Sequence, residues 1–249
     1  MLLLLSPAKT LDFSPSEFST HTQANFLEES QRLIDLLRPM TTAGIQELMK
    51  VSEKIAQLNV DRYQSFELPF DQDNAKQAIL AFKGDVYQGL AAEEFDAADL
   101  EFAQEHIGIL SGLYGFLKPL DLMQPYRLEM GTKLQNEQGK NLYEFWGTKI
   151  TDYINSLAPS SIVNLASKEY FKAVDTKTLN NVVWNIDFKE NKNGKYKIIA
   201  FYAKQARGMM AHYAVKNRLT APEQLKGFDM DDYRYNEELS EGQNLVFTR

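Results

Sequence analysis

The sequence LLLLSPAKT, residues 2–10, is the first of three segments in which a short apolar run stops at a serine. The other two are IGILSGLYG, residues 107–115, and IVNLASKEY, residues 162–170. Short continuous apolar runs are typical of buried parallel strands. In open α/β sheets, ligands bind just beyond the carboxyl ends of such strands. The loops that begin at Ser6, Ser111 and Ser167 are therefore predicted to meet at one cleft.

The composition indicates a globular protein without cysteine chemistry. The chain has 249 residues, of which 44% are hydrophobic, and it contains no cysteine. Disulfides, thiolate metal sites and iron–sulfur clusters are thereby excluded. No apolar run approaches the roughly 20 residues of a membrane span, and the N-terminus lacks a signal-peptide pattern. We expect one domain over residues 1–249, a cytoplasmic location and no membrane contact.

The pattern of apolar runs and helical periods predicts a mixed β-sheet flanked by helices, in one α/β or α+β domain. The expected strands are 2–5, 107–110, 162–166, 182–188, 196–202 and 245–247. The expected helices are 23–37, 45–58, 74–82, 98–106, 142–157 and 203–218. Asn191-Lys192-Asn193-Gly194 is typical of a hairpin turn.

The charges are unevenly distributed. The protein has a net charge of −7, yet residues 189–218 contain eight basic residues against Glu190 alone. Lys204 and Arg207 lie three residues apart in the helix expected there, so they share a face, with Arg218 further along it. This face is either a contact for phosphate or an ordinary solvated surface.

Lys9 follows the first apolar run and has three interpretations. As a cation at a strand end it would bind phosphate or carboxylate, and as a desolvated amine it would act as a nucleophile or base. In the third interpretation it is a surface lysine with no binding or catalytic role. Ser6 belongs to the same loop, while Lys83 and Tyr87 become relevant if they reach the same cleft.

The segment from Ser111 to Gly131 is the densest in unusual residues. Gly112, Leu113, Tyr114 and Gly115 suit a tight turn or close approach to a ligand. Downstream, Tyr126 offers a stacking face, and Arg127 and Glu129 lie on one side of an extended stretch. A second interpretation is a helix-hairpin-helix whose turn amides hold a DNA phosphate. The structural alternative is a packed connection with an Arg–Glu bridge.

The combination of LLLLSPAKTLD, AILAFKGDVYQGL, LSGLYGFLKPLDLMQPYRLEMG, NLASKEYF and FYAKQARGMMA closely resembles the YaaA family of bacterial peroxide-stress-resistance proteins. The resemblance runs in order from residue 1 to about residue 247. It implies a cytosolic protein induced by hydrogen peroxide that limits free iron and Fenton damage. It also implies a basic cleft, a helix-hairpin-helix element, and binding to duplex or branched DNA. No established reaction accompanies the family.

We therefore expect a DNA-binding protein of the peroxide stress response. Gly112, Leu113, Tyr114, Gly115, Lys204, Arg207 and Arg218 are the expected DNA contacts. Lys83, Tyr87, Ser111, Tyr126 and Ser167 are expected to line the cleft. The alternative is an enzyme acting on a nucleobase or nucleotide, with Lys9 as the activated amine and Ser6, Arg127 and Glu129 beside it. His21, His106 and His212 show no metal-ligand spacing, so we predict neither a metal nor a cofactor. The sequence does not determine an oligomeric state.

Overall fold

The three apolar runs form neighbouring parallel strands at the centre of the main sheet. The computed structural model describes residues 1–16 and 18–249. In it β1 (Leu2–Leu5) is fully buried and pairs in parallel with β6 (Ile107–Ser111) on one side and β9 (Ile162–Asn164) on the other. The loops that follow these strands therefore leave the sheet at the same edge, as the sequence predicts.

The mixed character of the sheet is confirmed. Its strand order is β12-β13-β10-β9-β1-β6-β7. The strands β10 (Val183–Lys192) and β13 (Asn244–Thr248) continue the parallel core, while β7 (Gly115–Leu117) and β12 (Arg234–Tyr235) are antiparallel edge strands. A hairpin joins β10 to β11 (Lys195–Lys197). Two small sheets pair β2 (Thr10–Leu11) with β5 (Phe82–Lys83), and β8 (Asp121–Met123) with β3 (Thr22–Gln23) and β4 (Lys76–Gln77).

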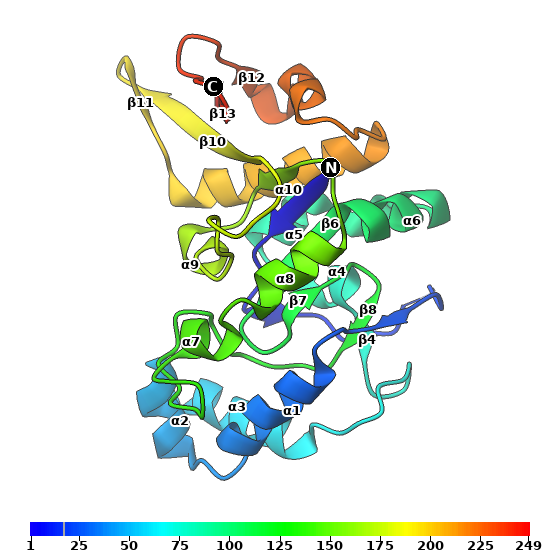
Figure 1. Cartoon of the computed structure of the whole chain (residues 1–249), viewed down its shortest axis with the longest axis vertical. Coiled ribbons are helices and arrows are strands. Elements are labelled where there is room, and N and C mark those ends of the chain that lie inside the picture. The colour runs from blue at the N-terminus through cyan, green and yellow to red at the C-terminus, as the bar shows by residue number, and fades with distance from the viewer. Residues whose placement is uncertain (17) are drawn as a thin grey trace.

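Helices cover the sheet and form a separate layer below it in Figure 1. They are α1 (Leu27–Leu37), α2 (Thr42–Met49), α3 (Glu53–Ser65), α4 (Ala78–Ala81), α5 (Asp85–Leu90), α6 (Ala97–His106), α7 (Leu142–Trp146), α8 (Lys149–Ser156), α9 (Lys168–Phe171) and α10 (Ala200–Lys216). Short 3-10 helices occupy Ala92–Glu94, Pro222–Gly227 and Met230–Asp232. The helices α5, α6 and α10 pack together against the main sheet, and α1, α2 and α3 lie at the bottom of the view. Within the described ranges, none of these helices has the length and apolarity needed to cross a bilayer.

Several predicted elements have different boundaries. The helix expected over 45–58 is two helices, α2 and α3, because Lys50 adopts a left-handed conformation with φ of 53°. The helix expected over 142–157 is interrupted at Gly147, where φ is +48°. Over the expected strand 196–202, the strand ends at Lys197 and α10 begins at Ala200.

The helix-hairpin-helix expected around Gly112–Gly115 is wrong. Residues 107–117 form a β-hairpin instead, with Ser111 paired to Gly115 across the turn. Gly115 has φ of +66°, and the indole of Trp146 donates a hydrogen bond to the Gly112 carbonyl at 3.0 Å. The turn is buried, so its amides do not reach a nucleic acid. Two consecutive helices joined by a short turn, α2 and α3, pack against each other elsewhere in the chain.

The helices α5 and α10 cross in direct backbone contact. A methyl group built on Gly208 of α10 would lie 1.8 Å from the Val86 carbonyl oxygen, and one built on Gly89 of α5 would lie 2.1 Å from that of Gln205. Only glycine permits this approach at both positions. The crossing fixes the first half of α10 against residues 86–89 of α5.

Candidate functional site

A cavity of about 400 Å³ lies at the carboxyl edge of β1 and β9. Its walls come from the loop after β1, the segment before α5, the loop after β9 and the first half of α10. Seven residues predicted from the sequence line it: Ser6, Lys9, Lys83, Glu129, Ser167, Lys204 and Arg207. The convergence expected from the strand-and-serine pattern is thus present for the loops after β1 and β9.

The two serine loops are joined directly. The backbone N–H of Ser167 donates a hydrogen bond to Oγ of Ser6 at 2.8 Å. The Tyr87 hydroxyl donates to the Ser6 carbonyl at 3.1 Å from beneath the loop. Burial raises the pKa of Tyr87 well above its ordinary value, so the hydroxyl keeps its proton. Tyr87, expected to line the cleft, does not line this cavity; it is buried and holds the Ser6 loop in place by this hydrogen bond.

Glu129 forms ion pairs with two cations, one exposed and one largely buried. Its Oε2 atom lies 2.7 Å from Nζ of Lys9, and its Oε1 atom lies 3.0 Å from Nη2 of Arg127. The Lys9 side chain is 58% exposed, whereas that of Arg127 is 17% exposed. The buried Nε atom of Arg127 has no hydrogen-bond partner. Lys9 is thus an exposed, paired cation, and it lacks the desolvation that would activate an amine.

The remaining cations of the cavity are only partly neutralised. Lys83 pairs with Asp12 at 3.0 Å, and Lys204 lies 3.6 Å from Asp85. Both lysine side chains are more than half exposed, so these pairs are weakly held in water. Burial lowers the pKa of Arg207, with Asp187 acting in the opposite direction. Exposed pairs of this kind exchange readily for an anionic ligand.

Two further cavities share lining residues with this one. One neighbour, of about 570 Å³ and beside α2, shares Glu129 and Glu169 with it. The other, of about 690 Å³ and beside α9, shares Arg207. We call the three together the basic groove. Its basic residues are Lys9, Lys50, Lys83, Lys133, Lys168, Lys172, Lys177, Lys204 and Arg207.

Some predicted site residues lie away from the basic groove. Ser111 and Tyr126 are buried, and their hydroxyls bond to each other at 2.6 Å. Tyr114 and its neighbours Gly112, Leu113 and Gly115 are part of the core. Expected DNA contacts or cleft residues at these positions are therefore corrected to packing roles. Arg127 contacts the groove indirectly, through Glu129, as Tyr87 does through Ser6.

Arg218 is also separated from the expected basic face. Its Nη1 atom lies 2.7 Å from Oδ1 of Asp99, and its guanidinium lies over the Phe102 ring. Lys216 pairs with the same carboxylate at 2.7 Å. Arg218 lies beyond the end of α10 at Lys216 and has a left-handed backbone with φ of 53°, so it does not continue the helix face of Lys204 and Arg207. Its role is to bind α6 to the end of α10.

Sequence reasoning missed several groove residues. Glu169 accepts a hydrogen bond from the Gly131 N–H at 2.9 Å and stands between two of the cavities. Glu169 directly follows Ser167 and Lys168 in the motif NLASKEYF, so the sequence does contain a signal for this residue. Lys50 and Lys133 come from segments with no local signal, and only the tertiary fold brings them to the groove.

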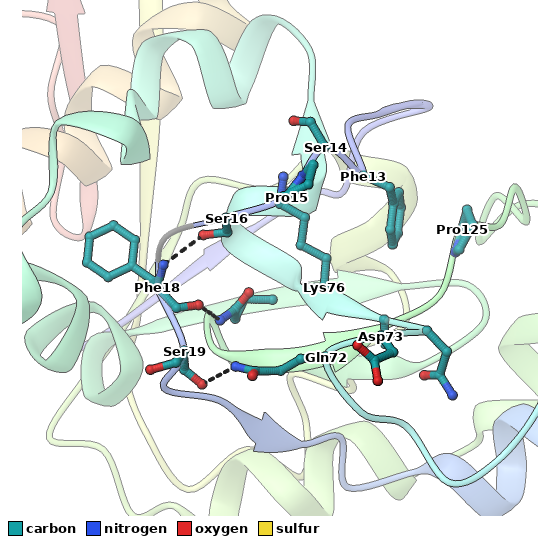
Figure 2. A pocket seen from close by; sticks show the side chains of 13 residues that line it. Phe13, Ser14, Pro15, Ser16, Phe18, Ser19, Gln72, Asp73, Lys76 and Pro125 are labelled. Carbon is teal, nitrogen blue, oxygen red and sulfur yellow. Dashed lines mark hydrogen bonds between the residues drawn. The ribbon is translucent and has the colours of Figure 1, made fainter.

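A further cavity, of about 410 Å³, is lined by residues 13–16, 18 and 19 together with residues 72–77 and Pro125, and is shown in Figure 2. Two of its polar side chains form hydrogen bonds to backbone carbonyls of the neighbouring segment. Gln77 donates to the carbonyls of Phe18 and Thr20 at 2.8 and 3.0 Å, and Lys76 donates to the Asp12 carbonyl at 3.0 Å. With one lysine and one aspartate on its wall, this cavity is less suited to an anion than the basic groove. Across residues 1–16 and 18–249, no cluster of three or more His, Asp or Glu side chains has a metal-binding arrangement.

Comparison with known proteins gives a consistent match along the chain. The family model described as peroxide stress protein YaaA matches residues 1–239. A protein of Saccharophagus degradans named UPF0246 protein is 53% identical over 254 residues. That alignment covers 100% of this chain and 99% of the relative.

Proposed function

Because this chain belongs to the family of peroxide stress protein YaaA, we propose that it acts in peroxide stress by binding DNA through phosphates in the basic groove. The observation that carries the proposal is the charge of the groove. Nine basic and six acidic side chains line it, in a protein whose net charge is −7. A positive groove in an acidic protein concentrates anions at that place.

The cations are arranged for a polyanion rather than for a single small anion. They come from the loop after β1, from α2, α9 and α10, and from the segments around Lys83 and Lys133. Several successive phosphates of a backbone can then be neutralised along one path. Phosphate contacts carry no base code, so DNA structure, duplex or branched, matters more than sequence.

At the centre of the groove, a phosphate can replace Glu129 as the partner of one cation. The Glu129 carboxylate lies between Lys9 and Arg127 and pairs with both of them. Binding of a phosphate near Lys9 replaces one anion by another and leaves Arg127 paired with Glu129. The cost is small because the exposed Lys9–Glu129 pair contributes at most about 1 kcal/mol.

The proposal extends to iron-dependent damage of DNA. Ferrous iron associates with DNA phosphates as a counterion, and hydroxyl radicals formed from peroxide at that iron attack the nearest bases. A protein that neutralises phosphates releases their counterions. The proposed binding therefore lowers both the iron held on DNA and the oxidative damage there.

A salt titration tests the proposal. Each neutralised phosphate contributes about −0.9 to the slope of log affinity against log salt. Replacing both Lys204 and Arg207 by alanine removes up to two contacts, so the slope becomes shallower by about 2 units on duplex and branched DNA. Arg218→Ala serves as the control and leaves the slope unchanged. Absence of wild-type binding at low salt would overturn the proposal.

A second candidate is an enzyme acting on a nucleobase or nucleotide. It is favoured by the presence of Lys9, Glu129 and Glu169 in one cavity of about 400 Å³. In this candidate Lys9, which is exposed and paired with Glu129, holds the phosphate of the nucleotide, and Glu169 exchanges a proton with the base. Mass spectrometry of mononucleotides and oligonucleotides incubated with the protein tests it. Conversion by the wild type and none by Lys9→Met would favour the enzyme over the DNA-binding protein.

A further inference from the structure

Large apolar side chains are unusually exposed where β11 leads into α10. Within the described ranges, eight large hydrophobic residues are classed as exposed, and four of them fall in residues 196–202. Tyr196 is 42% exposed, Ile198 52% and Phe201 54%. Tyr202 is partly covered by the Arg249 guanidinium. The exposed rings are thus concentrated on one short segment rather than scattered as single residues.

Three lysines lie within residues 190–197 of the same hairpin, and one of them, Lys197, lies opposite Glu190. In the register of β10 and β11, Lys192 lies directly opposite Lys195, and Tyr196 lies opposite Asn191. Alternation along β11 places Lys197 on the face of Lys195 and Tyr196 on the other. Like charges directly opposite each other destabilise a hairpin. A polyanion on the lysine face removes that repulsion.

The exposed segment is continuous with the basic groove. Phe201 and Lys204 are three residues apart in α10, so they are neighbours on one helix face. Lys204 lines the central cavity of the groove. Figure 1 shows the hairpin of β10 and β11 projecting beyond the body of the protein before the chain returns into α10. A strand of nucleic acid leaving the groove past Lys204 reaches this projection next.

We propose that the hairpin platform, formed by Lys192, Lys195, Tyr196, Lys197, Ile198 and Phe201, binds single-stranded DNA by stacking its unpaired bases. The proposal rests on the proposed function and adds the DNA structure that is recognised. Aromatic side chains beside basic ones are the usual means of holding single strands without sequence preference, because every base has a face that stacks. Lysines alone would be explained as protection of a free sheet edge. The exposed Tyr196, on the opposite face of the hairpin, and the exposed Ile198 and Phe201 that follow β11 are not explained in that way.

Affinity measurements with two probes test the platform. The probes are a fluorescent oligo(dT) of about 20 nucleotides and a duplex of equal length. The test variant carries Tyr196→Ala with Phe201→Ala. The control variant carries Leu58→Ala with Leu239→Ala, which removes exposed apolar side chains elsewhere. We expect the test variant to bind oligo(dT) roughly tenfold or more weakly than the wild type. Duplex affinity stays within about twofold, and the control variant matches the wild type on both probes.

The outcomes separate this proposal from the one on which it rests. Unchanged oligo(dT) affinity, or equal losses on both probes, overturns the platform while wild-type duplex binding still supports the groove. A variant that dissociates into monomers from a larger assembly with unchanged oligo(dT) affinity also overturns it, since the segment would then contact a second copy. Wild-type protein that binds oligo(dT) but no duplex overturns the duplex role of the groove and leaves the platform standing.

Discussion

Lys9 and Glu129 form an ion pair across the central cavity, with Nζ and Oε2 2.7 Å apart. Lys9 belongs to the loop after β1, and Glu129 belongs to the extended segment after β8. The pair therefore joins two separate walls of the basic groove. Because Arg127 holds the other oxygen of Glu129, the carboxylate keeps its place when Lys9 turns toward a ligand.

Replacement of Lys9 by methionine is expected to weaken DNA binding and abolish peroxide protection. The change removes one phosphate contact, so the slope of log affinity against log salt becomes shallower by about 1 unit. Thermal stability changes little, because an exposed pair contributes about 0–1 kcal/mol. Salt titration, survival of cells under hydrogen peroxide and a melting curve measure the three effects.

Lys140→Met is the matched control for Lys9→Met, because Lys140 is exposed and lines none of the three cavities of the basic groove. It should leave the salt slope and peroxide survival unchanged. A folded Lys9→Met protein that protects cells fully would remove Lys9 from the mechanism.

Replacement of Gly208 by alanine is expected to destabilise the protein. Alanine improves helix propensity by about 1 kcal/mol, but its methyl group would lie 1.8 Å from the Val86 carbonyl oxygen. The two helices must separate, which costs about 1–3 kcal/mol or more. The melting temperature should fall by several degrees, at about 2–4 °C per kcal/mol for a chain of this size.

Gly44→Ala provides the contrast for Gly208→Ala. A methyl group on Gly44 of α2 meets its nearest neighbour at 3.6 Å, which is an ordinary contact. This variant should be as stable as the wild type or more stable. Equal melting temperatures for Gly208→Ala and the wild type would contradict the close crossing of α5 and α10.

The central strands could be predicted because their signal is local. Residues 2–5, 107–110 and 162–166 are apolar at nearly every position, and they became β1, β6 and β9. The loops after β1 and β9 could then be placed at one edge of the sheet from topology alone. Ser6, Lys9 and Ser167 meet there for this reason.

The use of Gly112 and Gly115 could not be predicted from the sequence. Glycine permits close approach to a ligand and to another part of the protein equally well. Here the neighbour is Trp146, more than 30 positions later in the chain, whose indole bonds to the Gly112 carbonyl. Arg218 shows the same difficulty, since its partner Asp99 comes from a distant helix. Tertiary contacts of this kind leave no mark on local sequence patterns.

Ferrous iron is expected not to form a one-to-one complex with the protein at micromolar concentration. His106 and His212 use Nδ1 in contacts with the carbonyls of Met1 and Leu90, in different parts of the fold. Dispersed carboxylates bind divalent iron weakly. Anaerobic equilibrium dialysis measures the stoichiometry, with DNA alone as the positive control for iron retention. A stoichiometric complex would mean that iron is held by the protein itself.

Ionisation of Asp121 is expected to lower the free energy of unfolding as the pH rises from about 4 to about 6. Burial raises the pKa of this carboxyl to about 6 from an ordinary value of 3.8, despite hydrogen bonds from the Thr22 hydroxyl at 2.6 Å and the Lys118 N–H at 2.7 Å. The folded protein therefore holds this proton over a pH range in which the unfolded chain has already lost it. Protonation favours the fold at low pH, and ionisation of the buried group opposes it as the pH rises.

The comparison of the wild type with Asp121→Asn isolates the contribution of Asp121, because every other carboxylate titrates in both proteins. The free energy of unfolding, measured by urea titration, should fall in the wild type relative to the variant by up to about 3 kcal/mol between pH 4 and pH 7. Above about pH 7 the difference becomes level, since Asp121 is then ionised in both states. Asparagine cannot ionise, so any constant loss from its altered hydrogen bonds shifts the whole curve without changing its slope. A wild-type-minus-variant difference that is flat across this range would show that the Asp121 carboxylate is as well solvated in the folded protein as in the unfolded chain.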